Sequence, residues 1–397
     1  MRNDIKGGSA KDMKNSNRLI VLKLVSLKGA IKRSEIMQYT NLSKMTATNI
    51  AEDLTEKGFL TEDTEKENLL GAGRRPGVLK LSDNSPAIAG VYIGRKSCSV
   101  VISDLSAKVI FTEKKEYEMV GGAESLISFI SGMLENALSK TERKILSVGL
   151  SAPGPVDALN GVILSPSNFF SIKNLPIKRI LEEKFKLPFT LFHDTACAAQ
   201  GEFLYGNGKN EENFLLVHLH NGIGAGIIAN GKIFDGAMGL GGELGHISID
   251  YNGEICDCGR RGCLEKYANE QNLLKDYNSK SSEKLNEASL KEITKMAFDG
   301  DTAALFALDK FCNYLSAALI SALNFIDTHK VILSYHGTGG VLERMLEEKI
   351  NSGVFASGYR KISVISSKFN GDATIIGAVA AAAEEIFSGK VKITEEW

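Results

Sequence analysis

One imidazole and three thiols lie within a stretch of eighteen residues: His246, Cys256, Cys258 and Cys263. The three sulfurs fall within eight residues, and two glycines between the last two cysteines let the backbone turn tightly. Thiolate and imidazole donors in this number are typical of a closed, tetrahedral zinc site. The spacing therefore predicts a structural Zn²⁺ held by these four residues.

A disulfide is the alternative for these thiols. Cys256 and Cys258 are too close in sequence to pair comfortably, and any pairing leaves one of the three thiols odd. The remaining cysteines, Cys98, Cys197 and Cys312, lie far apart and are predicted to be small buried hydrophobes. Nothing else in the sequence indicates an oxidising compartment, so the pattern favours the metal over the disulfide.

The N-terminal residues Met1 to Lys6 do not lead into an apolar signal-peptide core. The sequence also has no run of about 18 uncharged apolar residues of the kind that crosses a bilayer. We therefore expect a soluble, cytoplasmic protein with no membrane association. At 397 residues the chain exceeds what one hydrophobic core usually serves, so two or three domains are expected.

Charge is distributed unevenly along the chain, although the overall net charge is only −1. Residues 1–82 carry 15 Lys and Arg against 10 Asp and Glu, a net charge of +5, and the remainder carries −6. A basic head on an acidic body indicates that the head meets a polyanion.

The head has the residue pattern of three short helices. Leu19, Leu22 and Val25 recur at helical spacing before Lys28 and Gly29 end the first helix. A second helix is expected to start at Ser34 as its N-cap, and a third at Ser43 after a tight connection. Gly58 is suited to follow the C-terminus of the third helix. This order is that of a helix-turn-helix, whose last helix enters the major groove.

The third helix is predicted to have two distinct faces. Met45, Ile50 and Leu54 are expected to face a small core. The outward side chains, which would contact DNA, are those of Lys44, Thr46, Thr48 and Asn49.

A hairpin is expected after the third helix, from Phe59–Glu62 and Val78–Leu81. Between its strands lies a glycine-rich wing tip that carries Arg74 and Arg75. Two guanidinium groups at such a tip suit phosphate contact or insertion into the minor groove. Residues 1–82 are thus predicted to be a winged helix-turn-helix domain. The alternative is a small helical subdomain that binds another protein.

From Ala87 onward, apolar strands alternate with glycine-rich turns and helices. Hairpins or single strands are expected at 88–104, 145–150, 189–192, 214–228 and 330–334, and helices at 122–139, 178–186 and 374–386. Repeated hairpin-plus-helix units argue for a two-lobed α/β body with a cleft between its lobes.

Three motifs in the body are specific enough to carry a family resemblance. They are Glu243 to His246, the Cys-x-Cys-Gly-x-x-Gly-Cys-Leu-Glu run that ends at Glu265, and His193-Asp194 shortly before Ala198 to Glu202. With the winged head, nearly the whole chain resembles the transcriptional-regulator branch of the ROK family of bacterial sugar repressors and kinases. The resemblance implies a sugar-kinase-like body of the actin and hexokinase type.

The resemblance also implies where the lobes divide. The N-terminal lobe would span 87–193 and be completed by a C-terminal helix at 373–390. The C-terminal lobe, with the zinc site, would span 194–372. A monosaccharide effector would lie between the lobes, and its hydroxyls would meet the following residues: Asn168, His193, Asp194, Glu243, His246 and Glu265. The family usually has Asn at the position of His193. His246 would serve zinc through one ring nitrogen and the sugar through the other.

Kinases of the family carry Asp-x-Gly-Gly-Thr in the first strand turn, where this chain has Tyr92-Ile93-Gly94-Arg95-Lys96. A tyrosine cannot replace a carboxylate in organising Mg²⁺, and Arg95 stands where a glycine allows close approach to phosphate. In the second phosphate loop His220-Asn221 replaces Gly-Thr. Asp194 persists at the position of the kinase general base. We therefore expect a sensor without catalytic residues.

The sequence thus predicts a sugar-responsive repressor of carbohydrate-utilisation genes that binds operator DNA as a homodimer or a dimer of dimers. Two alternatives remain: a sugar kinase with a DNA-binding head, and a repressor that a partner protein sequesters.

Overall fold

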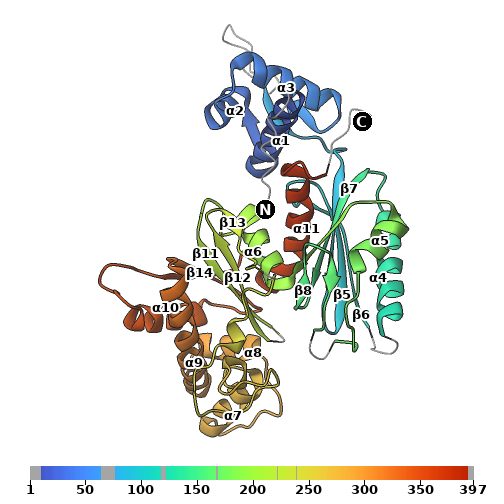
Figure 1. Ribbon diagram of the computed structural model, residues 1–397. Helices are drawn as coiled ribbons and strands as arrows, with labels where there is room; N and C mark the ends of the chain where they lie inside the picture. Colours follow the sequence, from blue (N-terminus) through green and yellow to red (C-terminus); the bar gives the residue numbers. More distant parts are fainter. Residues whose placement is uncertain are drawn as a thin grey trace.

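The computed structural model describes residues 10–63, 77–117, 122–166, 169–220, 222–237 and 239–391. Within these residues three units follow one another: a helical head, an N-terminal lobe and a C-terminal lobe. Figure 1 shows the head above the N-terminal lobe, with helices α6 and α11 running between the two lobes.

The head consists of three helices and a small antiparallel sheet of order β1-β3-β2. Its elements are α1 (Ala10–Lys28), β1 (Ala30–Lys32), α2 (Arg33–Thr40), α3 (Lys44–Glu56), β2 (Leu60–Asp63) and β3 (Val78–Leu81). The expected hairpin is confirmed, with Leu60 opposite Leu81 and Asp63 opposite Val78. Strand β1, which joins it as a third strand, was not expected from the sequence.

Two details of the head differ from the sequence prediction. The N-cap of α2 is Lys32 and not Ser34, because the Glu35 carboxylate accepts the Lys32 backbone N–H at 2.8 Å one turn earlier. Met45 is 75% exposed, because it lies outside the buried face of α3, which runs from Ala47 to Leu54. Ser43 caps α3 as expected by accepting the Thr46 N–H at 3.2 Å.

The N-terminal lobe is built on a five-stranded sheet of order β10-β7-β4-β5-β6. Its strands are β4 (Ala87–Ile93), β5 (Ser97–Ser103), β6 (Val109–Glu116), β7 (Ile145–Ala152) and β10 (Phe189–His193). Strands β4, β7 and β10 are parallel, and β5 and β6 are antiparallel. Helices α4 (Gly122–Leu138) and α5 (Ile177–Phe185) cover one face, and a two-stranded ribbon precedes α5, formed by β8 (Val156–Asp157) and β9 (Val162–Ile163).

The C-terminal lobe repeats the same topology. Its sheet has the order β13-β12-β11-β14-β15, so both lobes follow the order 3-2-1-4-5 when their own strands are numbered in sequence. The strands are β11 (Phe214–Leu219), β12 (Ile223–Ala229), β13 (Lys232–Ile233), β14 (Lys330–Ser334) and β15 (Ser363–Ser366). The hydrophobic pattern had indicated repeated hairpin-plus-helix units, and the shared strand order confirms the repeat.

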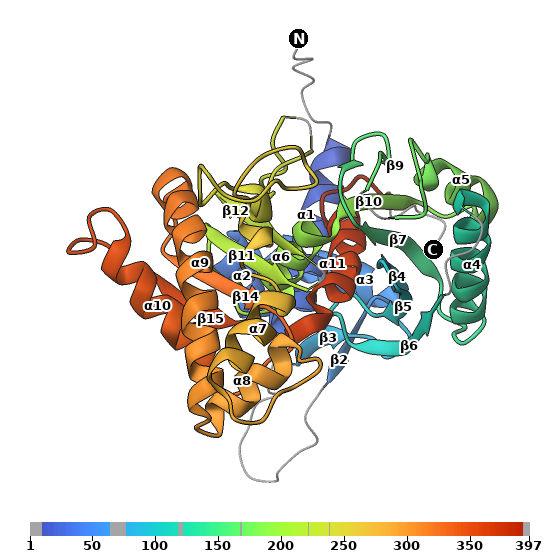
Figure 2. The same cartoon turned by 90° about the horizontal axis from the view of Figure 1, so that it is seen from below.

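Helices of the C-terminal lobe pack around the outer face of its sheet (Figure 2). They are α7 (Glu270–Lys280), α8 (Leu290–Phe298), α9 (Thr302–Ile326) and α10 (Val341–Gly353), with 3₁₀ turns at Leu244–His246, Leu264–Lys266 and Asn370–Asp372. Helix α9 has the length and apolar composition of a membrane span, but 56% of its most apolar window is buried inside the protein, as in a core helix.

Helices α6 (Asp194–Tyr205) and α11 (Ala373–Phe387) lie against each other between the sheets. Their backbones touch, because a Cβ built on Gly377 would lie 1.9 Å from the Cys197 carbonyl oxygen. Only glycine permits this approach. Helix α11 also packs on β4 and β7, so the C-terminal end of the chain completes the N-terminal lobe.

The head shares its hydrophobic core with the body. Leu22 and Val25 of α1 belong to the same buried cluster as Val379 and Ile386 of α11. An ion pair between Lys23 and Glu384, 2.9 Å long, lies at the edge of this contact. The head is therefore seated on α11 through apolar packing.

A buried carboxylate joins α6 to the connection between β15 and α11. Glu202 is fully buried and accepts hydrogen bonds from the Ser367 hydroxyl at 2.6 Å and from the Lys368 backbone N–H at 2.9 Å. Its second oxygen accepts the Asn207 backbone N–H at 2.6 Å. One side chain thus satisfies three donors from two segments far apart in sequence.

Glu202→Ala is expected to lower the free energy of unfolding by about 3 kcal/mol, because it leaves these donors without their acceptor. Urea denaturation monitored by circular dichroism measures the change. Glu183→Ala on α5, where the side chain is exposed, is the control and should change stability by less than about 0.5 kcal/mol. Equal midpoints for Glu202→Ala and the wild type would contradict the prediction.

Candidate functional site

A cavity of about 550 Å³ lies between the two lobes. Five of the six side chains predicted to bind a sugar line it: His193, Asp194, Glu243, His246 and Glu265. Asn168 lies outside the described residues. The cavity walls also include residues that the sequence interpretation had assigned to the altered phosphate loops, namely Tyr92, Gly94, Arg95 and His220.

Asp194 reaches the cavity because it is the first residue of α6, directly after β10 ends at His193. Residues at the carboxyl ends of parallel strands are the usual ligand-binding positions of open α/β sheets. The His193 ring lies 3.1 Å from an Asp194 carboxylate oxygen through Nε2 and 3.0 Å from the Thr195 hydroxyl through Nδ1. Gly154 leaves room for this ring, since a Cβ there would lie 2.8 Å from His193 Nε2.

Glu265 projects from the 3₁₀ turn that follows the last cysteine of the cluster. Its Oε1 accepts the backbone N–H of Ile223 at 2.8 Å, which fixes the carboxylate against strand β12. Gly245 lies beneath it, where a Cβ would be 2.5 Å from the Glu265 side chain. The acidic group is therefore oriented by two backbone segments of the C-terminal lobe.

The predicted metal ligands converge on one point. One ligand atom from each of His246, Cys256, Cys258 and Cys263 lies within 4.8 Å of the other three. His246 Nδ1 is 3.8 Å from the Cys256 sulfur, and the sulfurs of Cys258 and Cys263 are 3.6 Å apart. A tetrahedron with Zn–S bonds of about 2.3 Å has edges of about 3.8 Å, so the separations fit a four-coordinate metal.

The same geometry excludes a disulfide within the cluster. A bonded pair would have its sulfurs about 2.05 Å apart, and all six cysteines are free thiols. The Arg260 backbone N–H lowers the pKa of Cys258, whereas burial, followed by the neighbouring thiols, raises the pKa of Cys263 to about 12. A nearby cation would favour the thiolate of Cys263 that a metal needs as its ligand.

The turn between β4 and β5, which the sequence interpretation assigned to an altered phosphate loop, lines one side of the cavity. It is closed by a hydrogen bond from the Gly94 N–H to the Ser97 carbonyl, 2.9 Å long, and the Tyr117 hydroxyl donates to the Gly94 carbonyl. Burial, with the nearby Asp194 charge, raises the pKa of Tyr92, so this residue stays a neutral phenol at neutral pH. The backbone N–H and carbonyl of Gly94 are therefore both already hydrogen-bonded within the protein.

Two histidines, His218 and His220, also line the cavity, although the sequence interpretation had identified only His220. His218 lies at the end of β11, fully enclosed, with Nδ1 3.1 Å from the Ser334 hydroxyl. Its ring stacks 4.9 Å from that of His220. Burial lowers the pKa of His218 to about 4 and also lowers that of His220, so both are neutral at neutral pH. The sequence feature that could have identified His218 is a histidine within an otherwise apolar strand.

The predicted DNA-contacting residues of α3 differ in their exposure. Lys44 and Asn49 are exposed, and Thr46 and Thr48 are half-buried. The Thr46 hydroxyl lies 2.8 Å from the Ser43 hydroxyl. Arg74 and Arg75 of the expected wing lie outside the described residues.

The fold and site define a class: a two-lobed α/β protein of the sugar-kinase type with a Cys₃His cluster beside its cleft and a helical head. Residues 88–385 match the ROK family, three quarters of the chain, and the chain belongs to this family.

Relatives in the family cover nearly the whole chain. It is 30% identical over 395 residues to the DNA-binding transcriptional dual regulator NagC of Escherichia coli, with 96% of each chain covered. It is 26% identical over 391 residues to the xylose repressor of Caldicellulosiruptor bescii, covering 95% of this chain and 97% of the relative.

Solved structures agree with this assignment. A ROK family transcriptional regulator, a homologue of the E. coli Mlc protein, superimposes with a TM-score of 0.78 at 25% identity, over 96% of this chain and 98% of that one. A ROK family glucokinase from Streptomyces griseus, in complex with glucose and AMPPNP, matches 75% of this chain and 99% of its own length. Its TM-score is 0.66 at 23% identity, a likeness of fold.

Protonation of His218 is expected to make folding pH-dependent. The folded pKa near 4 lies below the unfolded value of about 6.5, so the unfolded state binds more protons between these values. Stability should therefore fall by about 3 kcal/mol from this group as the pH drops from 6.5 to 4.

Urea denaturation across this pH range tests the expectation by comparing the wild type with His218→Asn, which should lose less stability on acidification. His329→Asn, at an exposed histidine, is the control and should follow the wild type. Parallel profiles for His218→Asn and the wild type would contradict the assignment.

Proposed function

We propose that this protein is a sugar-responsive DNA-binding repressor of carbohydrate-utilisation genes, whose cleft binds a monosaccharide without phosphorylating it. The observation that carries the proposal is one cavity in which the acidic and imidazole groups suited to sugar hydroxyls face an altered phosphate turn. The printed names of the relatives, xylose repressor and NagC, support the regulatory role.

The head is proposed to be a winged helix-turn-helix. Helices α2 and α3 are joined by three residues, and the β2–β3 hairpin follows α3 directly. The net charge of +5 over residues 1–82 favours contact with DNA phosphates. The exposed side of α3 with Lys44 and Asn49 would enter the major groove. Two such heads on a dimer would read a pseudo-palindromic operator.

The sugar is proposed to lie between Asp194 on one side and Glu243, His246 and Glu265 on the other. Carboxylates accept hydrogen bonds from adjacent hydroxyls, and a buried group left without its partner costs about 1–3 kcal/mol. This penalty would let the site discriminate between sugars. Ligand alters operator affinity only through its different affinities for the two conformations of the protein, and a ten-fold effect needs about 1.4 kcal/mol.

Zinc is the metal that suits the Cys₃His set. Three sulfurs and one imidazole nitrogen make a closed structural site with no open position for catalysis. The metal would tie His246 to the segment that carries Glu265 and so orient both toward the sugar. With His246 Nδ1 directed at the sulfurs, Nε2 is left for the ligand.

A sugar kinase with a DNA-binding head is the second candidate. It is favoured by Asp194, which lines the cavity and, by the family resemblance, would correspond to the general base of the kinases. The closed turn at Gly94 and the neutral Tyr92 oppose it, because Mg²⁺ and phosphate need carboxylate and open backbone donors.

The metal assignment predicts close to one zinc per chain in protein purified without added zinc. Cys258→Ser should lose the metal, because a hydroxyl is a poor ligand for zinc in this set. Metal analysis by mass spectrometry measures both. Cys312→Ser, at a buried cysteine far from the cluster, is the control and should keep its zinc. A metal-free wild type with normal ligand binding would contradict the proposal.

Single substitutions should affect the response to sugar and the affinity for operator independently of each other. Asp194→Asn is expected to bind operator normally and to show no release by sugar. Lys44→Ala should bind sugar normally and lose operator affinity, with a salt dependence reduced by about one ion.

A panel of monosaccharides screened by thermal shift identifies the ligand first, since a ligand at 100 times its Kd adds about 2.7 kcal/mol to the free energy of unfolding.

Fluorescence anisotropy of labelled operator, with and without that sugar, then measures release. Lys140→Ala, an exposed lysine of the body, is the matched control for Lys44→Ala. Turnover of ATP with a sugar at ordinary kinase rates would establish the kinase instead. Operator affinity that no sugar in the panel changes would contradict the sensor.

A further inference from the structure

His218 is a buried histidine in a strand that borders the cavity between the lobes. It lies in β11, is 6% exposed, and lines that cavity. Strands β11 and β14 pair in parallel with His218 opposite Ser334. The ring Nδ1 of His218 lies 3.1 Å from the Ser334 hydroxyl. The register of two adjacent strands therefore sets this pair of side chains.

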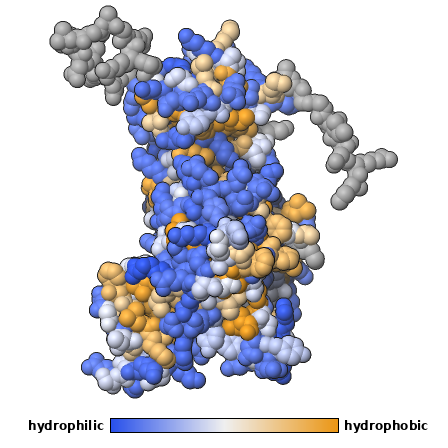
Figure 3. Space-filling view, turned by 90° about the vertical axis from the view of Figure 1, so that its left-hand side faces the viewer, coloured by the Kyte–Doolittle hydropathy of each residue, from blue (hydrophilic) through white to orange (hydrophobic). Residues whose placement is uncertain are grey.

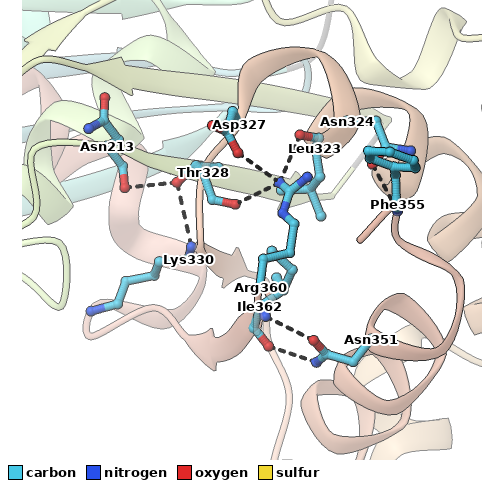
Figure 4. Close-up of polar contacts among 10 residues, drawn as sticks. All are labelled: Asn213, Leu323, Asn324, Asp327, Thr328, Lys330, Asn351, Phe355, Arg360 and Ile362. Atoms are coloured by element: carbon cyan, nitrogen blue, oxygen red, sulfur yellow. Dashed lines mark hydrogen bonds and ion pairs between the residues drawn. The ribbon is translucent and has the colours of Figure 1, made fainter. Parts of the chain in front are cut away.

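Polar contacts fix that register at the opposite end of the two strands (Figure 4). Asn213 comes directly before β11, and its carbonyl accepts the Thr328 hydroxyl at 2.8 Å, two residues before β14 begins. Arg360 holds the same segment from another side, with its guanidinium group 3.4 Å from the Asp327 carboxylate. A slip in register would have to break these contacts, so the histidine and the serine stay opposite each other.

The hydrogen bonds of Ser334 decide which ring nitrogen of His218 carries the proton. A serine hydroxyl has one hydrogen, and Ser334 donates it to the Asn370 carbonyl at 3.1 Å. Ser334 is then the acceptor for His218, so Nδ1 carries the N–H. Burial lowers the pKa of His218 to about 4, against a smaller opposing effect of the Asp194 charge, so the ring is neutral. Nε2 is therefore an acceptor, and among the described residues none donates to it.

The charged groups that line the cavity are mainly acidic. Among the described residues of its walls, one is a cation, Arg95, and four are carboxylates: Asp194, Glu243, Asp257 and Glu265. Burial lowers the pKa of both His218 and His220, so neither adds a positive charge at neutral pH. An anion beside Nε2 is therefore disfavoured, whereas a hydroxyl that donates to it is favoured.

Hydrogen-bonding groups for a ligand rich in hydroxyls are concentrated in the cleft. Figure 3 shows apolar surface gathered over the lower part of one outer face, where the C-terminal lobe lies. A second cavity of about 380 Å³, beside the last turn of α9, has mostly aliphatic walls that include Leu215, Ile227 and Ile326. Neither place offers such a ligand the polar partners that surround His218.

We propose that His218 determines specificity in the sugar site by accepting a hydrogen bond through Nε2 from a hydroxyl of the effector, and that the effector is an uncharged sugar and not its phosphate ester. Ser334 is the positioning residue, because it is fully buried and acts on the ligand by selecting the tautomer of His218. Loss of one such bond weakens binding about ten-fold. The inference rests on the proposed function, since it names the class of ligand for the cleft.

Isothermal titration calorimetry on the full chain tests the class of ligand. The probes are glucose, mannose and N-acetylglucosamine, each as the free sugar and as its 6-phosphate, together with xylose. At least one free sugar is expected to bind ten-fold or more tightly than any phosphate ester. A phosphate ester that binds as tightly as the best free sugar, and releases labelled operator, would overturn this inference and leave the repressor standing. Operator affinity that none of these probes changes would contradict the proposed sensor itself.

His218→Asn tests the contact through monodeoxy forms of the sugar that binds. Asparagine keeps a donor toward Ser334 but has no acceptor at the position of Nε2. One monodeoxy sugar should bind the wild type about ten-fold more weakly than the parent sugar, yet bind His218→Asn as tightly as the parent does. His329→Asn, at an exposed histidine, is the control and should follow the wild type. Equal losses in wild type and His218→Asn for every monodeoxy sugar would refute the contact.

Ser334→Ala tests the positioning role with a readout of the tautomer. In protein with ¹⁵N-labelled histidine, two-bond ¹⁵N–¹H NMR spectra report which ring nitrogen carries the proton, and His218→Asn assigns the signal. The wild type should show Nδ1–H, and Ser334→Ala should show a mixture of tautomers and weaker sugar binding. Ser352→Ala, at an exposed serine of α10, should match the wild type. Circular dichroism establishes that each variant is folded, and a wild-type His218 protonated on Nε2 would overturn the proposal.

Discussion

Direct backbone contact between α6 and α11 is the constraint on which the rest of the structure depends. Gly377 allows the two helices to touch at Cys197, and both sheets are then built outward from this pair. Because α6 begins at Asp194, the contact fixes a cleft residue relative to both lobes. Because α11 also carries the head, the same contact relates the cleft to the head. A side chain larger than hydrogen at Gly377 would therefore displace the lobes, Asp194 and the head at the same time.

The two ends of α6 illustrate how one element can link distant sites. Its first residue faces the cavity, and its last turn is tied through Glu202 to the connection before α11. Just beyond it, the Lys209 side chain donates to the Leu27 carbonyl near the end of α1. Movement of α6 relative to either lobe would therefore also displace the base of the head. This is a chain of physical contacts, and coupling along it requires two states that the ligand distinguishes.

The cysteine cluster lies in a segment with little regular secondary structure. The segment between His246 and Glu265 has a 3₁₀ turn at each end and contains two isolated β-bridges, Ser248 with Cys263 and Ile255 with Arg261, but neither an α-helix nor a longer strand. Such a segment has little hydrophobic core of its own, and a metal bound by the four converging donors would supply the missing constraint. Glu265 is held in the cavity by its bond to Ile223 and by this fold of the chain. With its metal bound, the cluster would therefore help to fix the position of a carboxylate of the cleft.

The sequence alone determined those features that depend on local spacing and on chemistry. The Cys₃His ligand set, the hairpins of both lobes, the cap of α3 at Ser43 and the motif around Asp194 all lie within short windows of the chain, where periodicity and residue type suffice. Local rules failed where tertiary packing chose between equivalent options. Met45 is apolar, yet it is 75% exposed, and Ala47 is buried against the head core instead. His218 entered the cavity because β11 and β14 pair in parallel beside Ser334, a register set by residues more than one hundred positions away. The contact at Gly377 and the seat of the head on α11 were likewise decided only in three dimensions, because each depends on surfaces that meet after the lobes have folded.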